Sequence, residues 1–226
     1  MKLDLHLHTN FSYDGLSSPA KIVKAAIEKR LDGICITDHN EIKGATEAIS
    51  LARGILVLPG IEVKSREGDV LGINVKEIIP DGLPAEEVIE EIIKKGGLPA
   101  IAHPFDFFLP FKGIEKLTPF LLKKGVAIEV YNASIFYNVL NKVADKFCND
   151  FNLPFIAGSD AHSSEFVGKA YIEIPKDNLS PEEILDEIKK RNCKVSFEKA
   201  YLVEKIAELL RRGVAKTNYY VTKRKI

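Results

Sequence analysis

The sequence predicts a single α/β domain built on parallel strands, and two observations support this prediction. Short β-branched runs alternate with segments in which apolar residues recur every three or four positions, over the whole 226-residue chain. No composition break or linker rich in Ser, Gly or Pro interrupts this alternation. Residues 1–226 are therefore expected to form one domain.

The strands are expected where β-branched and apolar residues run together between turn residues. These segments are Lys2–His8, Gly33–Thr37, Leu56–Val63, Val70–Val75, Pro99–Ala102, Ala127–Tyr131, Pro154–Gly158, Ala170–Ile174 and Lys194–Phe197.

The helices are expected between most of these strands. Ser18 and Ser180 each precede a proline, a pattern that begins helices, here running to about Leu31 and Arg191. The other expected helices are Glu41–Arg53, Ala85–Lys95, Ile114–Lys124, Tyr137–Phe151 and Leu202–Arg212. The basic end of the chain, Lys216 with residues 217–226, is expected to be a solvated or frayed terminus rather than a contact for nucleic acid.

Charge and composition exclude several classes of partner. The 32 Lys and Arg balance the 32 Asp and Glu, which argues against a general affinity for nucleic acid or for anionic membranes. Apolar runs such as residues 54–63 are shorter than the roughly 20 residues that cross a bilayer, and the N-terminus lacks a secretory signal. Three widely spaced cysteines without a CxxC pair argue against a disulfide framework. We therefore expect a cytoplasmic protein with no membrane partner.

The five histidines all lie at, or within a few residues of, the predicted carboxyl end of a strand. In folds with parallel strands the following loops converge at that edge, where functional sites form. Strict alternation in the first strand puts Asp4, His6 and His8 on one face. A single His or Asp at a strand end is more often a cap or a hydrogen-bonded core residue. Burying the whole group without a counter-charge, however, would cost several kcal/mol.

Divalent cations would supply that counter-charge. Imidazole nitrogens with carboxylate oxygens suit zinc, manganese or iron. The candidate ligands number eight, which predicts two or three ions: His6, His8, Asp14, His39, Glu62, His103, Asp160 and His162. Glu62 has two oxygens and is expected to bridge two ions. Asp4 and Asp38 are expected to orient imidazoles, with direct ligation by Asp38 left open.

Six motifs occur in order along residues 4–162. They are His6-x-His8-Thr9, Ser12-Tyr13-Asp14-Gly15, Thr37-Asp38-His39, Gly60-Ile61-Glu62, His103-Pro104 and Gly158-Ser159-Asp160-Ala161-His162. Together they resemble the PHP (polymerase and histidinol phosphatase) superfamily, in its short stand-alone phosphoesterase form. The resemblance implies a distorted seven-stranded (β/α) TIM-like barrel, completed by residues 168–212, and metal-dependent hydrolysis of phosphoesters.

The resemblance also assigns the eight ligands to individual metals. One metal is held by His6, His8, Glu62 and Asp160, a second by Asp14, His39 and His162, and a third in part by Glu62 and His103. A hydroxide on the metal held by the first four residues would attack phosphorus. The third metal stays open, because the next strand ends in Glu129, Tyr131 and Asn132 and offers no His.

The predicted function is hydrolysis of a small phosphate monoester or nucleotide. A histidinol-phosphate-type phosphatase is less favoured, because Asp14 stands where such members carry a His. An exonuclease of the same superfamily would need a basic track that the neutral composition does not offer. An amidohydrolase would need further His ligands on later strands, and a non-catalytic metal-stabilised regulatory or binding module would be expected to lose ligands. Candidate substrate contacts are Lys64, Arg66, Phe105 and Asn132, and the oligomeric state is left open.

Overall fold

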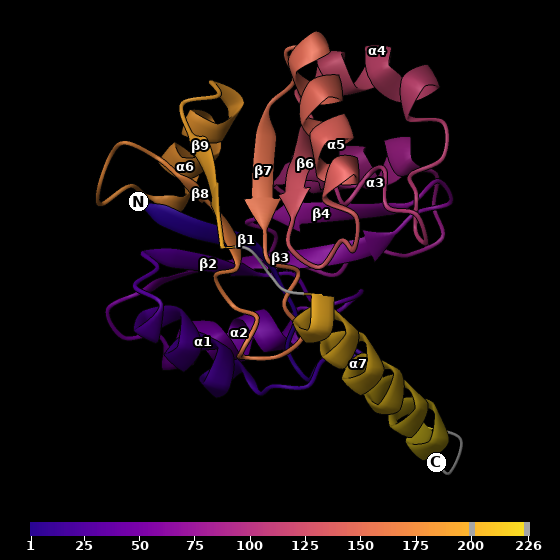
Figure 1. Ribbon diagram of the computed structural model, residues 1–226. Coiled ribbons are helices and arrows are strands. Elements are labelled where there is room, and N and C mark those ends of the chain that lie inside the picture. Colours follow the sequence, from indigo (N-terminus) through magenta and orange to yellow (C-terminus); the bar gives the residue numbers. More distant parts are fainter. Residues whose placement is uncertain (199–201, 224–226) are drawn as a thin grey trace.

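The computed structural model describes residues 1–198 and 202–223, and over these residues it has nine strands and seven helices (Figure 1). The strands are β1 (Lys2–Leu7), β2 (Gly33–Ile36), β3 (Leu56–Lys64), β4 (Asp69–Ile73), β5 (Leu98–Ile101), β6 (Ala127–Asn132), β7 (Phe155–Gly158), β8 (Ala170–Glu173) and β9 (Lys194–Phe197). The helices are α1 (Pro19–Glu28), α2 (Lys43–Leu51), α3 (Ala85–Lys94), α4 (Ile114–Lys124), α5 (Asn138–Asp150), α6 (Pro181–Lys189) and α7 (Leu202–Lys223). Each expected strand and helix is present, and only the end of α7 differs by more than a few residues.

The strands curl into a nearly closed barrel. Hydrogen-bonded neighbours follow the order β7-β6-β5-β4-β3-β2-β1, and the chain after β7 returns to the end of β1. There the N–H of Asp160 donates to the carbonyl of His6, and the N–H of His8 donates to the carbonyl of Ala161, both at 2.8 Å. β8 pairs with the beginning of β1 and β9 pairs with β8, outside this ring. Closure therefore brings the motifs at residues 6–8 and 158–162 together.

Two strands, β4 and β8, run antiparallel to their neighbours, so the expectation of parallel strands does not hold for these two. For β4 the reason is the length of the connection. Only residues 65–68 join β3 to β4, whereas a parallel crossover needs a dozen or more residues. Ser65 closes this turn, with both its N–H and its hydroxyl donating to the carbonyl of Gly68. As a result Asp69, the first residue of β4, pairs with Lys64 at the edge where β3 ends.

Both faces of β1 are buried. Leu3 and Leu5 belong to the same core cluster as Ile184 of α6, and His6 and His8 on the other face are also fully buried. The alternation in β1 therefore separates a buried apolar face from a buried polar face, and not a buried face from a solvent-exposed one.

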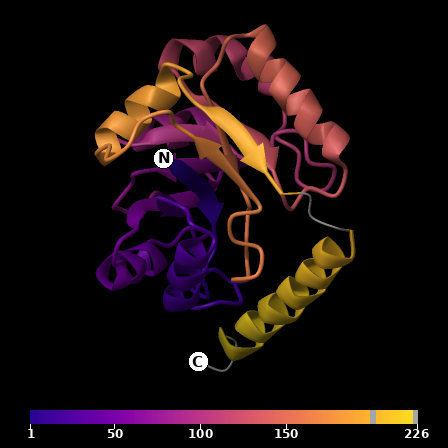
Figure 2. The ribbon, with the colours of Figure 1, turned by 60° about the vertical axis from the view of Figure 1, so that its left-hand side comes forward.

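The C-terminal helix is longer than expected. α7 continues to Lys223, so the predicted end at Arg212 and the frayed terminus are wrong as far as residue 223, while residues 224–226 lie outside the described part of the chain. Figure 1 shows α7 below the carboxyl ends of β6 and β7, and Figure 2 shows the same helix as a straight rod at the lower edge of the molecule.

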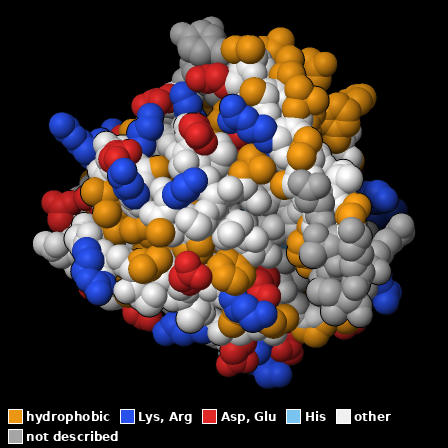
Figure 3. Space-filling model, turned by 90° about the horizontal axis from the view of Figure 1, so that it is seen from below, with side chains coloured by type: hydrophobic (Ala, Val, Ile, Leu, Met, Phe, Trp, Pro, Cys, Tyr) orange, Lys and Arg blue, Asp and Glu red, His pale blue; other side chains and the backbone are white. Residues whose placement is uncertain are grey.

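Among the described helices, none has the length and apolar character needed to cross a bilayer. Figure 3 shows the molecule from below, where Lys and Arg side chains are interspersed with Asp and Glu. The described side chains on that face therefore form no uniformly basic tract, in keeping with the zero net charge.

Candidate metal centre

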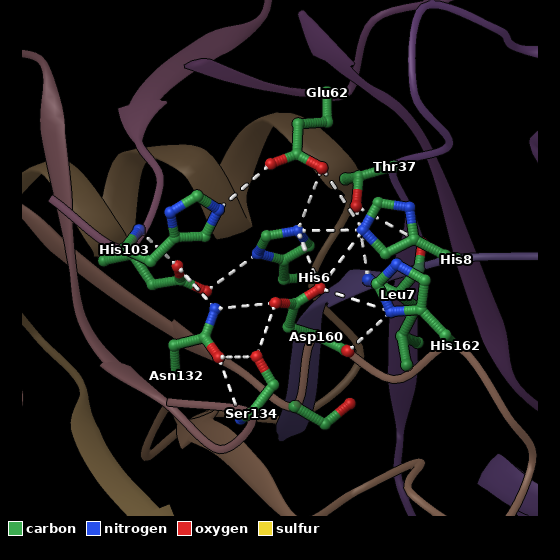
Figure 4. A network of polar contacts seen from close by, with 12 residues as sticks. His6, Leu7, His8, Thr37, Glu62, His103, Asn132, Ser134, Asp160 and His162 are labelled. Atoms are coloured by element: carbon green, nitrogen blue, oxygen red, sulfur yellow. Dashed lines mark hydrogen bonds and ion pairs between the residues drawn. The ribbon is translucent and has the colours of Figure 1, made fainter. Parts of the chain in front are cut away.

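The eight predicted ligands converge at one end of the barrel. Figure 4 shows His6, His8, Glu62, His103, Asp160 and His162 among them. They come from β1, from the loop after it, from β3 and from the segments that follow β2, β5 and β7. Two of them, His103 and Asp160, have positive φ angles of 28° and 52°. Non-glycine residues in this region are strained, and such strain is typical of functional sites.

Glu62 lies at the middle of the cluster. Its Oε2 is 3.0 Å from His39 Nδ1, 3.2 Å from His8 Nε2 and 3.4 Å from His6 Nε2. Its Oε1 faces the other way and is 3.3 Å from His103 Nε2. The two oxygens of the Glu62 carboxylate thus lie beside two different groups of imidazole nitrogens, which is the arrangement expected of a bridging ligand.

His6 and His8 direct the same atoms at one point. Their Nε2 atoms are 3.1 Å apart, and Asp160 Oδ1 is 3.5 Å from the first and 3.3 Å from the second. On the other side of His8, Asp14 Oδ2 is 3.3 Å from His162 Nε2, and Asp14 Oδ1 is 3.7 Å from His39 Nε2.

Several of these atoms are buried without a hydrogen-bond partner. Within the described residues, the buried side-chain atoms in this state are Asp14 Oδ1, His39 Nε2, Glu62 Oε2, His103 Nδ1, Ser159 Oγ and His162 Nε2. Five of these six belong to predicted ligands, and an unpaired buried polar atom costs about 1–3 kcal/mol. Divalent cations fit this donor set, since they would satisfy nitrogen and carboxylate oxygen together.

Hydrogen bonds hold the imidazoles in place from behind. His6 Nδ1 is 2.9 Å from Glu129 Oε1, and His8 Nδ1 is 3.1 Å from the Ser12 hydroxyl. His162 Nδ1 lies 3.0 Å from the carbonyl of Asp160. When Nδ1–H donates to these oxygens, Nε2 keeps its lone pair toward the centre, which is a common way to orient a metal-binding histidine.

Asp4 and Asp38 support the centre through other groups. Asp38 accepts hydrogen bonds from the Thr9 N–H at 2.6 Å and from the Ser12 hydroxyl at 3.0 Å, and Ser12 in turn contacts His8. Asp4 accepts the N–H of Ser159 and of Gly168, so it holds the backbone after β7. Ser12 and Glu129, rather than Asp4 and Asp38, therefore contact the imidazoles directly, and Asp38 acts on His8 through Ser12.

The role of Glu129 was not predicted from the sequence. Glu129 is 1% exposed in β6, and besides His6 its carboxylate accepts the N–H of His103 at 2.7 Å and the amide of Asn132 at 3.1 Å. The sequence feature that could have indicated this role is the presence of a single acidic residue inside the otherwise apolar segment Ala127–Tyr131.

Burial and the nearby carboxylates act in opposite directions on the pKa values of the imidazoles, and the balance differs from one histidine to the next. Burial disfavours a charged His8, but the carboxylates of Asp160 and Glu62 beside its Nε2 outweigh burial and raise the pKa of His8 to about 9. Burial lowers the pKa of His39 to about 3 and that of His162 to about 4, and the charge of Arg212 adds to the effect at His162. For Asp160 burial acts upward, yet the charge of His6 holds its pKa well below the usual range.

A cavity of about 380 Å³ lies over the cluster. Of the candidate substrate contacts, Lys64 lines this cavity. Phe105 packs against Phe147, with ring centres 5.6 Å apart, and Arg66 Nε donates to the carbonyl of Gly82. Asn132 is fully buried and joins Glu129 to Asp160.

Other residues in the cavity wall were not predicted. Asp69 of β4 lies with Glu62 and His103 as a third group whose ligand atoms are within 4.8 Å of one another. Arg212 and Lys216 of α7 also line the cavity. Arg212 Nη2 donates to Asp14 Oδ2 at 3.1 Å, and Lys216 Nζ is 4.9 Å from the centre of the Tyr13 ring.

This chain is similar to known proteins both in sequence and in structure. The family described as PHP domain matches residues 4–102, and the family described as PHP-associated matches residues 139–193. An uncharacterized protein of Methanocaldococcus jannaschii is 34% identical over 156 residues, covering 64% of this chain and 89% of that protein. A probable histidinol-phosphatase of Thermotoga maritima is 24% identical over 211 residues, covering 77% and 90%.

Among solved structures, a two-domain protein of Bacteroides vulgatus that contains a predicted PHP-like metal-dependent phosphoesterase superposes with a TM-score of 0.68. The identity is 22%, over 88% of this chain and 65% of that chain, so this chain spans less than two thirds of the Bacteroides protein. At this identity the likeness concerns the fold.

Proposed function

Since this chain belongs to the PHP domain family, we propose that it hydrolyses a small phosphate monoester, or a nucleotide, with divalent cations bound at the barrel end. The observation that supports this most directly is the set of unpartnered ligand atoms around Glu62, beneath a cavity of about 380 Å³. Bound divalent cations would activate water and stabilise the negative charge on phosphate oxygens.

Two cations are proposed from the groups of ligand atoms that converge. The first would be held by His6, His8 and Asp160 with one oxygen of Glu62, and the second by Asp14, His39 and His162. Zinc, manganese and iron all accept this mixture of imidazole and carboxylate.

A third cation is proposed between Glu62, His103 and Asp69. The sequence left this cation open because β6 offers no His. Asp69 supplies the additional carboxylate from β4 instead, and its side chain is buried at the cavity wall. The Asp69→Asn variant is expected to hold one ion fewer than the wild type at saturation, measured by metal analysis of the purified protein.

The chain's own residues have two tasks in this proposal. Glu129 and Ser12 fix the direction of His6 and His8, so the ligand atoms are in place before substrate arrives. The cavity, whose lining includes Glu62, His103 and Asp160, would favour a compact substrate whose phosphate reaches these side chains.

The test combines metal analysis with a hydrolysis screen over nucleotides, sugar phosphates, histidinol phosphate and a chromogenic diester. We expect at least two ions per chain and turnover of one phosphoester class by the wild type. The variant carrying both His6→Ala and His8→Ala is expected to lose metal and activity together. Full activity in that variant despite loss of metal would contradict the proposal.

A further inference from the structure

The C-terminal helix α7 is anchored to the strand ends that form the metal centre. Glu208 Oε1 accepts the N–H of His162 at 3.1 Å, and its Oε2 accepts the Ser163 hydroxyl at 2.7 Å. Lys205, one turn earlier, donates to the carbonyl of Ile135. Glu208 is only 5% exposed, so this face of α7 is held against the barrel. Both family matches end before α7 begins.

Arg212 lies one turn after Glu208 and reaches into the centre. Its side chain is 22% exposed, and its Nη2 donates to Asp14 Oδ2 at 3.1 Å. A guanidinium carries five N–H donors in a planar fork, so this contact leaves donors for a second anion. Asp14 Oδ1 has no hydrogen-bond partner. Asp14 can therefore accept a hydrogen bond from Arg212 with Oδ2 and bind a cation with Oδ1.

The same helix forms a wall of the cavity. Leu209, Arg212, Gly213 and Lys216 line it from α7, and Phe108 and Leu109 line it from the loop after β5. Lys216 adds a positive charge one turn beyond Arg212, above the Tyr13 ring. Bound cations would compensate the carboxylates beside Arg212, and the guanidinium could then bind an added anion. Arginine forks bind phosphate through paired hydrogen bonds.

We propose that Arg212 binds the phosphoryl group hydrolysed at the metal centre, and that α7 is the wall that restricts the substrate to a terminal phosphate on a compact molecule. This inference rests on the proposed function, and it adds a phosphate-binding residue that lies outside both matched segments.

The test compares Arg212→Ala and Arg212→Lys with Arg211→Ala, which removes the neighbouring exposed arginine. Each protein is loaded with Mn²⁺ and its metal content is measured. Binding of inorganic phosphate is followed by titration calorimetry, and kcat and KM are measured with p-nitrophenyl phosphate. Arg212→Ala is expected to weaken phosphate binding and to lower kcat/KM roughly a hundredfold, the scale of removing one donor to a transition-state oxyanion. The phosphate affinity and kcat/KM of Arg212→Lys should lie between those of the wild type and Arg212→Ala, because lysine keeps the positive charge but lacks the paired N–H donors of the guanidinium.

Arg211→Ala should match the wild type in both measurements. Wild-type phosphate affinity and kcat/KM in Arg212→Ala at equal metal content would overturn the assignment. If Arg212→Ala loses metal or fails to fold, Arg212→Lys decides the question, and wild-type phosphate affinity in that variant would likewise overturn it.

Two further results separate this inference from the proposed function. If the metal-loaded wild type hydrolyses no phosphoester, the proposed function fails, while calorimetry still decides whether Arg212 binds phosphate. A circular single-stranded oligonucleotide has no terminal phosphate. If α7 restricts the substrate as proposed, the wild type should not cleave this oligonucleotide. Its cleavage by the wild type would overturn the role of α7 while leaving phosphoester hydrolysis intact.

Discussion

Three hydrogen bonds converge on the carboxylate of Glu129, from His6, His103 and Asn132. This side chain thereby fixes the ring of one predicted ligand and the backbone of another. Burying a carboxylate is tolerated only when its oxygens accept hydrogen bonds, because a buried carboxylate without partners would destabilise the fold. At the scale of single residues, the geometry of the centre depends on such supporting groups as well as on the ligands.

The Glu129→Gln variant is expected to weaken metal binding by about 10–100-fold, the usual cost of losing a group that orients a ligand. The physical reason is that an amide has one acceptor oxygen and turns its NH₂ toward a donor. Competition with a chromogenic chelator measures the affinity. The exposed Glu47→Gln on α2 is the control and should bind metal like the wild type. Unchanged affinity in Glu129→Gln would contradict the role assigned to this residue.

Gly44→Ala is expected to disturb the centre from α2. A Cβ there would lie 1.9 Å from Asp38 Oδ2 and 2.4 Å from Thr9 Oγ1, so Asp38 must move and release Ser12 from its position behind His8. We expect lower metal affinity, although alanine favours a helix by about 1 kcal/mol over glycine. Gly213→Ala, whose Cβ would meet nothing within 4 Å, is the matched control. Equal metal affinity in the two variants would refute this reasoning.

At the scale of elements, the two Ser-Pro helix starts differ. Ser180 before α6 accepts the N–H of Glu183, and the Glu183 carboxylate accepts the N–H of Ser180, which completes a capping box. Ser18 before α1 makes no side-chain capping bond, although proline follows it in the same way. The capping glutamate three residues after Ser180 distinguishes the two in the sequence, since Lys21 stands at the matching place after Ser18.

Ser180→Ala is therefore expected to lower the free energy of unfolding by about 1 kcal/mol, the usual loss for a capping side chain. Ser18→Ala, with no capping bond to lose, should cost less. Denaturant unfolding of the two variants beside the wild type measures the difference. A larger loss in Ser18→Ala than in Ser180→Ala would show that capping does not set the stability of these helices.

At the scale of the whole molecule, barrel closure gathers carboxylates that repel one another. Asp14, Glu62, Asp69 and Asp160 line one cavity, and in the absence of cations protonated imidazoles and Arg212 offset their charge. Cation binding should therefore stabilise the fold as well as prepare the site for an anion.

Adding a divalent cation at a hundred times its Kd is expected to stabilise the wild type by about 2.7 kcal/mol for one site, because the cation binds the folded form. For a domain of this size that corresponds to a rise of roughly 5–10 °C in Tm. Differential scanning calorimetry with and without Mn²⁺ measures the shift. The Glu62→Gln variant should show a smaller rise, and an equal rise would argue against Glu62 as a shared ligand.

The sequence by itself predicted the strands and, within the described residues, every helix except the full length of α7. It could do so because periodicity is a local property, and it predicted candidate ligands because the carboxyl ends of parallel strands meet at one edge. The barrel was implied by the resemblance of the six motifs to a known family. The short connection at residues 65–68 makes β4 antiparallel to β3, and the tertiary pairing of β4 with β3 and β5 then decided that Asp69, at the start of a strand, lies at the edge where β3 ends. Tertiary packing also decided the place of Glu129 behind His6 and of Arg212 beside Asp14, since these contacts join residues 123 and 198 positions apart. Contacts over such separations depend on how the barrel closes and where α7 lies against it, and no local pattern in the chain encodes them.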